Sequence, residues 1–219
     1  MNRGTQIRIK AILCGSRYLF LVAGVLLLSY VGYAVVDARL FQAVETRRFQ
    51  QTITELKPAA HGGEHISPLL ATSGAVNRDK ADHSAMDTDG SRVGRIEISA
   101  VGLSAMILEG VGDETLRRAV GHIPGTSLPG QKGNIAIAGH RDTFFRSLRN
   151  IHKNDEITLT TLNGFYRYRV DSTKIVDPKE SDVLDESDDA VLTLITCYPF
   201  YFVGSAPQRF IVRAHHSPG

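Results

Sequence analysis

The chain has 219 residues, which is long enough for one folded domain together with accessory segments. Its formal net charge of +2 is too small to indicate a nucleic-acid partner. The position of the charges along the chain is more informative than their sum.

The N-terminal segment combines basic residues with a long apolar stretch. Residues 1–17 contain four Arg or Lys residues and no acidic one, and residues 18–36 contain no charge at all. Such a stretch can cross a hydrocarbon core of ~30 Å, and the basic flank favours a cytoplasmic N-terminus. A cleavable signal peptide is the alternative, but its apolar region is normally shorter, and the small-residue site Val36-Asp37-Ala38 is weak. We therefore expect a retained single-pass anchor in the cell membrane, with the chain after Asp37 extracytoplasmic.

This topology separates the two cysteines. Cys14 lies on the cytoplasmic side or at the inner interface, so it cannot pair with Cys197. Cys197 is then a single unpaired thiol in an oxidising compartment, a combination that needs a functional reason.

Two further segments precede a region of short strands. Residues 37–57 carry apolar residues at loosely helical spacing, which predicts a helical stalk and, less strongly, a partner-binding helix. Residues 58–92 contain paired glycines and no aromatic residue, so we predict a flexible tether. The predicted organisation is 1–17 basic cytoplasmic N-terminus, 18–36 transmembrane anchor, 37–57 helical stalk, 58–92 flexible tether and 93–215 β-barrel domain.

From Val93 onward, short apolar segments alternate with turns. Strands are predicted at 95–99, 105–109, 134–138, 156–162, 174–176, 191–196 and 208–214, with a return strand through Tyr166, Tyr168 and Val170 and a short helix at 115–120. Asn163-Gly164 predicts a two-residue hairpin turn. Many short strands with little helix favour an all-β fold, a closed or nearly closed eight-stranded β-barrel.

Three of these strands carry chemically active side chains at their ends. Cys197 follows the strand 191–196, where Pro199 prevents a central strand from continuing far. His140 follows the strand 134–138, and Arg209 lies in the strand 208–214. A thiolate can attack an acyl carbon to give a thioester, an imidazolium can protonate the departing amine, and a guanidinium can stabilise the oxyanion. The three side chains together predict nucleophilic catalysis.

Each of these residues also has a simpler interpretation. A cysteine at the end of an apolar strand is often packed and inert, a lone histidine is often structural, and Arg209 could be a surface charge. We interpret His122 as structural, because the end of a strand places His140 better for reaching a thiol. Zinc is disfavoured because four ligands at short paired spacings are absent from the sequence. No metal and no cofactor are predicted.

Several segments resemble the signature segments of sortases, the membrane-bound cysteine transpeptidases. These segments are Ala138-Gly139-His140-Arg141, Thr193-Leu194-Ile195-Thr196-Cys197 and Pro207-Gln208-Arg209, within a resemblance that runs from about Gly94 to Ala214. The order of a histidine, a Thr-Leu-x-Thr-Cys strand and an arginine is highly specific for this family. Tyr198-Pro199 and the compact size look most like the class D branch, with class E as the alternative.

The resemblance implies an eight-stranded barrel and a role for each site residue. Cys197 would be the nucleophile, His140 the acid/base partner and Arg209 the group that binds substrate and stabilises the oxyanion. Thr196 would be a further substrate-binding residue.

The resemblance also implies the reaction and its partners. A sorting signal similar to Leu-Pro-x-Thr-Gly would be cleaved after the threonine, and the acyl group would pass to an amine of a cell-wall precursor or a pilin lysine. This reaction attaches secreted proteins to the surface, and membrane lipid is the remaining expected partner. Two alternatives stay open: a cysteine peptidase that uses water as acceptor, and a non-catalytic anchored binding domain in which Cys197 is buried.

Overall fold

The computed structural model describes residues 3–56, 90–202 and 204–217. The predicted tether falls almost entirely outside the described residues. The chain divides into two compact units, Met1–Phe41 and Gln42–Gly219. One helix, α1 (Arg3–Leu56), contributes to both units. Among the described residues it is the one helix long and apolar enough to cross a membrane, over a candidate span of Arg17–Gln51.

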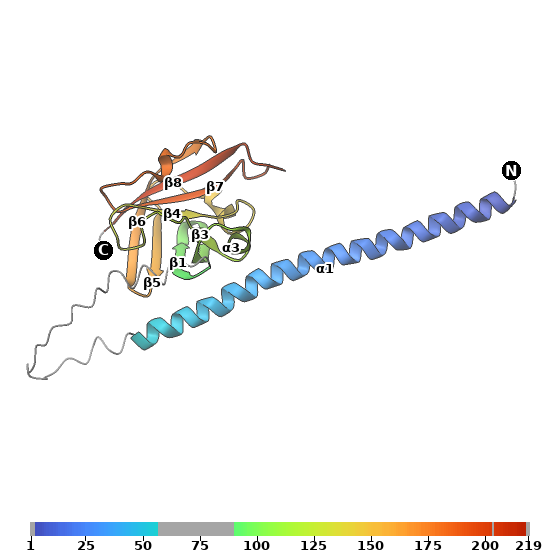
Figure 1. Ribbon diagram of the computed structural model, residues 1–219, viewed down its shortest axis with the longest axis horizontal. Helices are drawn as coiled ribbons and strands as arrows, with labels where there is room; N and C mark the ends of the chain where they lie inside the picture. The colour runs from blue at the N-terminus through green and yellow to red at the C-terminus, as the bar shows by residue number, and fades with distance from the viewer. Residues whose placement is uncertain (1–2, 57–89, 203, 218–219) are drawn as a thin grey trace, which may run out of the picture. The chain divides into compact units, whose positions relative to one another are not determined.

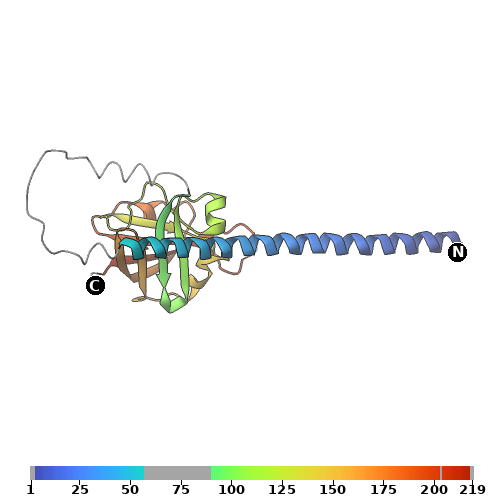
Figure 2. The same cartoon turned by 90° about the horizontal axis from the view of Figure 1, so that it is seen from below.

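Eight strands close into a barrel in the order β1-β2-β3-β4-β7-β8-β6-β5 (Figure 1, Figure 2). Their bounds are β1 Arg92–Ile98, β2 Leu103–Glu109, β3 Val120–His122, β4 Asn134–Ala138, β5 Glu156–Thr161, β6 Gly164–Val176, β7 Val191–Tyr198 and β8 Gln208–His216. The short helices are η2 (Ser99–Val101), α3 (Asp113–Arg118), η3 (Phe144–Asn150) and η4 (Asp182–Leu184). The closed eight-stranded barrel confirms the predicted fold class.

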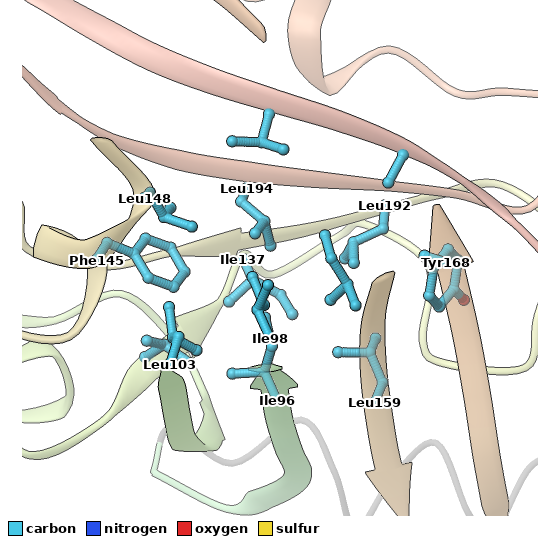
Figure 3. Close-up of a cluster of buried hydrophobic side chains, with 14 of the residues drawn as sticks. Ile96, Ile98, Leu103, Ile137, Phe145, Leu148, Leu159, Tyr168, Leu192 and Leu194 are labelled. Atoms are coloured by element: carbon cyan, nitrogen blue, oxygen red, sulfur yellow. The ribbon is translucent and has the colours of Figure 1, made fainter. Parts of the chain in front are cut away.

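The core fills the inside of the barrel with alternate residues of the strands. Leu192 and Leu194 of β7 point inward, as do Val212 and Ala214 of β8. Apolar side chains from β1, β4 and β5 meet them, and Phe145 of η3 packs against the same cluster (Figure 3). Because side chains alternate along a strand, the residues between these core positions face outward, and Cys197 and Arg209 are among them.

Two strand predictions differ from the structure. The predicted strand 174–176 is the far end of the long strand β6, which contains a bulge between Val170 and Ser172. The polar run at this bulge interrupts the apolar alternation and divides one strand into two in the sequence pattern. The eighth strand is instead β3, whose three residues are too few to show a period.

The hairpin between β5 and β6 is also shifted by one residue from its predicted position. Thr161 pairs with Gly164, so the two loop residues are Leu162 and Asn163. Gly164 is the first residue of β6, with a φ of 148°. The shift leaves the alternation of the return strand in place: Tyr168 and Val170 are buried and face the core.

The C-terminal part of α1 contacts the barrel beside the β2–β3 pair. The Gln42 side-chain amide accepts a hydrogen bond from the Met106 N–H over 2.9 Å and donates one to the Arg118 carbonyl over 2.7 Å. The backbone ladder between β2 and β3 begins one residue later, where Ile107 pairs with Val120. The amide of Gln42 therefore adds one rung to this ladder.

Two further residues of α1 belong to the same attachment. Phe49 is only 4% exposed, and Met106, which points away from the core cluster, is fully buried. The Glu45 carboxylate lies 3.1 Å from the Arg92 guanidinium, an ion pair without hydrogen-bond geometry. The predicted stalk is thus fastened to the domain from Gln42 onward.

Candidate active site

Two of the predicted catalytic residues lie directly opposite each other on neighbouring strands. β7 and β8 are antiparallel, and their register places Cys197 opposite Arg209. Directly opposed side chains point to the same face of a sheet and lie side by side. The Cys197 thiol is free and partly exposed, so the thiol and the guanidinium share the outer face of the barrel wall.

β4 brings His140 to the other side of Cys197. β4 and β7 are parallel, with Ala138 opposite Ile195, and extending this register by two residues brings His140 level with Cys197. The pairing continues past the end of β4, because the Gly139 N–H donates to the Ile195 carbonyl over 3.1 Å. β4, β7 and β8 are neighbours in the barrel (Figure 1), and neighbouring strands are ~4.8 Å apart. The register therefore places His140, just past the end of β4, beside Cys197, with Arg209 on the other side of Cys197. We call these three residues the outer row.

A second row of side chains lies next to the outer row on the same face. It consists of Ala138, Ile195 and Ile211, which occupy directly paired positions on the same three strands. All three are apolar, and Ala138 has the shortest side chain of the three, so little of it projects from β4. The outer row therefore borders an apolar strip of barrel wall in which Ala138 and Ile195 are partly exposed and Ile211 is buried.

Thr196 points to the opposite side of β7 from Cys197. It is 2% exposed, and its hydroxyl donates to the Gly139 carbonyl over 2.7 Å. This bond joins the end of β4, just before His140, to the strand that carries the thiol. The structure thus places Thr196 beside the row in a bond within the protein, and its substrate-binding role stays a prediction.

His122 lies in a buried network away from the outer row. Its Nδ1 is 2.7 Å from a carboxylate oxygen of Glu109, and its Nε2 is 3.0 Å from the Ser127 carbonyl. Since a carbonyl only accepts, we assign a proton on Nε2 to this contact. Both side chains are buried, in line with the structural interpretation of His122. No local pattern in the sequence pointed to its partner, Glu109.

The loop between β7 and β8 adds contacts that sequence reasoning missed. Nη1 of Arg209 donates to the carbonyls of Ala206, over 3.3 Å, and Gln208, over 3.0 Å. Arg141 donates to three carbonyls of the same loop. In the described part of the chain, no group of three His, Cys, Asp or Glu side chains is arranged to hold a metal ion.

Comparison with known families identifies the domain that carries this row. A sequence model of the Sortase domain matches residues 96–217, which is more than half of the chain and includes every residue of the outer row. The chain belongs to the sortase family. It is accordingly a cysteine transpeptidase of the sortase kind.

The relatives of this sortase match it over different lengths. Sortase D of Bacillus subtilis is 31% identical over 198 residues, covering 89% of this chain and 94% of the relative. The structure of a Clostridium perfringens Sortase D5 transpeptidase has a TM-score of 0.57 at 26% identity and covers 78% of this chain and 98% of its own. Sortase A of Listeria monocytogenes has a TM-score of 0.54 at 29% identity and covers 58% and 88%. These structures share the barrel that supports the outer row.

Gly139 of this sortase should not tolerate a side chain. A Cβ atom built at this position would lie 2.8 Å from the Phe145 ring, so Gly139→Ala should destabilise the fold by about 1–3 kcal/mol through overpacking. Because His140 follows directly, turnover should fall as well. Urea unfolding and steady-state kinetics measure the two effects. Adding Phe145→Leu should recover part of both losses, and strictly additive effects would contradict this steric explanation.

Arg209→Lys should remove most turnover and leave the fold intact. A lysine cannot reproduce the planar fork of the guanidinium, so a donor aimed at the substrate is lost. We expect the rate to fall by about ten-fold or more, with little change in Tm because the side chain is only half-buried. Arg213→Lys is the matched control on the same face of β8 and should keep near-normal turnover. Full activity of Arg209→Lys would remove Arg209 from the mechanism.

Proposed function

We propose that this sortase cleaves a sorting signal similar to Leu-Pro-x-Thr-Gly and transfers the acyl group to an amine. The register that sets Cys197 opposite Arg209, with His140 on the neighbouring strand, carries the proposal. The apolar strip beside this row supports it. The leucine and the proline of the signal would bury apolar surface against Ala138 and Ile195, which is favourable. The coverage of the two D-type relatives favours the class D branch.

The proposed reaction proceeds in two balanced steps. The Cys197 thiolate attacks the threonine carbonyl carbon, a C–S bond forms, the Thr–Gly C–N bond breaks, and the His140 imidazolium gives its proton to the departing amine. An incoming amine then attacks the thioester carbon, the C–N bond forms, the C–S bond breaks, and the proton returns to His140. Arg209 faces the carbonyl oxygen, where negative charge develops in both steps.

Product analysis with and without an amine tests this function. A labelled peptide with a Leu-Pro-x-Thr-Gly segment is incubated with the protein, with or without triglycine, and the products are weighed by mass spectrometry. We expect a triglycine adduct that is absent with Cys197→Ala. Release of the free acid alone, at all triglycine concentrations, would instead indicate a peptidase that uses water. Absence of any cleavage for a panel of sorting peptides would contradict the proposed function.

We further propose that residues 18–36 anchor the protein in the membrane with the barrel on the extracytoplasmic side. The apolar helix and the basic residues before it support this orientation. In intact cells, a membrane-impermeant thiol reagent should label Cys197 and leave Cys14 unlabelled, which peptide mapping can distinguish. Labelling of Cys14 alone would contradict the proposed orientation and indicate the opposite one.

In the proposed reaction, the acceptor in the cell would be an amine of a cell-wall precursor or of a pilin lysine.

A further inference from the structure

Arg141 connects the histidine segment to the loop between β7 and β8. Its guanidinium donates to the carbonyls of Pro199 over 3.2 Å, Phe202 over 2.9 Å and Gly204 over 2.8 Å. The guanidinium carbon also lies 5.9 Å from the centroid of the Phe202 ring, a cation–π distance. One side chain, directly after His140 in the chain, therefore holds three points of a single loop.

This loop in turn determines where the Arg209 guanidinium points. It joins the two strands whose ends carry Cys197 and Arg209. Nη1 of Arg209 donates to the carbonyl of Ala206, a residue of this loop, over 3.3 Å, so a displaced loop would withdraw one of the acceptors that orient the guanidinium. Its other acceptor, the Gln208 carbonyl at 3.0 Å, belongs to β8. Neither bond uses Nε or Nη2, and these donors remain for a substrate carbonyl.

The two ends of the loop are held by different forces. Phe200 packs against the hydrophobic core and lies 5.3 Å from the Phe210 ring, which fixes the beginning of the loop. Tyr201, by contrast, is 75% exposed and Phe202 is 46% exposed. Apolar burial does little to order such residues. The restraints on this part of the loop are a backbone bond from the Phe202 N–H to the Pro199 carbonyl over 3.3 Å and the three charge-assisted bonds of Arg141.

We propose that Arg141 is a positioning residue for acyl transfer: it holds the β7–β8 loop so that Arg209 faces the carbonyl attacked by Cys197. This inference rests on the proposed function. Arginine suits the task because its planar fork presents several donors in a fixed geometry, whereas a lysine offers a point charge on a flexible stem. Arg141 acts through the loop and Arg209, and it leaves the protonation of the thiol unchanged.

A double-mutant cycle on the full chain tests the coupling between the two arginines. With a sorting peptide as substrate, Arg141→Lys should lower kcat by about ten-fold or more and leave KM within about two-fold, because a contact made in the transition state is lost. In an Arg209→Lys background the same change should lower kcat by less than about two-fold. Effects that multiply in the double variant would overturn the proposal.

Arg149→Lys is the matched control for this cycle. The Arg149 guanidinium contacts the same loop through the Tyr201 ring, at 5.4 Å from its centroid. A cation over an exposed ring contributes little order, so kcat should stay within about two-fold of wild type. An equal loss in both lysine variants would mean that any guanidinium beside the loop matters, whether or not it donates to the loop carbonyls, and this too would overturn the proposal.

The pH profile of thiol alkylation separates positioning from a direct effect on Cys197. In a Cys14→Ser background, the rate of reaction with iodoacetamide follows the fraction of Cys197 that is thiolate. Arg141→Lys should leave this profile where it is in the parent protein. A shifted profile would show that Arg141 acts on the thiol itself and would contradict the inference.

Hydrogen exchange tests the loop without any turnover. In the inactive Cys197→Ala protein, Arg141→Lys should speed amide exchange in residues 199–207 and leave β4 and β7 unchanged. Unchanged exchange in the loop would overturn the inference even if the enzyme is a transpeptidase. If the loop responded while the wild-type protein turned over no sorting peptide, the proposed function would fail and the loop contact would stand.

Discussion

Cys197→Ala should abolish both cleavage and transfer of a sorting peptide. The variant lacks the atom that forms the thioester, and loss of a covalent nucleophile typically lowers kcat by about four orders of magnitude or more. His140→Ala should lower kcat by about 10²–10⁴-fold, because general acid–base catalysis contributes on that scale. Steady-state kinetics with a labelled peptide measures both losses.

Two controls keep this result specific. Cys197→Ala should unfold at nearly the same temperature as wild type, since the side chain is small and only partly buried. In a Cys14→Ser background, a thiol-reactive probe should label Cys197 in the folded protein. Failure to label, together with normal binding of a partner, would favour the non-catalytic alternative. Substantial cleavage by Cys197→Ala would refute the thioester mechanism outright.

Removing α1 should destabilise the barrel far more than the sequence predicts. The sequence pattern marks Val93 as the start of a self-sufficient domain, whereas the structure attaches the helix from Gln42 onward. A fragment 93–219 exposes Met106, which is fully buried in the whole chain. Since domains are stable by only about 5–15 kcal/mol, we expect this fragment to be marginal and a fragment 42–219 to fold cooperatively. Urea unfolding of the two fragments measures the difference.

Single substitutions in the full chain resolve this effect into parts. Phe49→Ala should cost about 3–5 kcal/mol, the usual range for a large buried aromatic residue. Gln42→Ala should cost about 1–3 kcal/mol, because it removes the side-chain bonds to the Met106 N–H and to the Arg118 carbonyl. Val44→Ala is the control on an exposed face of the same helix and should change little. Equal stability of the two fragments would contradict the role assigned to the helix.

The sequence predicted those features that local patterns encode. The alternation of apolar residues located most strands, and the positions of Cys197, His140 and Arg209 at strand ends followed from it. The pattern failed where a strand was irregular or short, as at the bulge after Val170 and in the three-residue β3. A bulge puts polar residues out of phase, and three residues show no period.

The contacts that orient the site were beyond sequence reasoning for another reason. Arg141 lies in a segment that resembles the family signature, yet its carbonyl partners are 58 to 63 residues away in the chain. Every residue carries a backbone carbonyl, whatever its side chain, so no sequence pattern could show which carbonyls Arg141 contacts. The two hydrogen bonds of Gln42 could not be predicted for the same reason, since they join its side chain to main-chain atoms of two distant segments.

The outer row is assembled from three separate stretches of chain, so its three side chains meet only when folding is complete. In a nascent polypeptide the sulfur has no neighbouring cation, because the histidine arrives with β4 and the arginine with β8. In the proposed mechanism, closure of the barrel is therefore a precondition for acyl transfer, because an incompletely folded copy lacks the acid/base and oxyanion partners of the thiol.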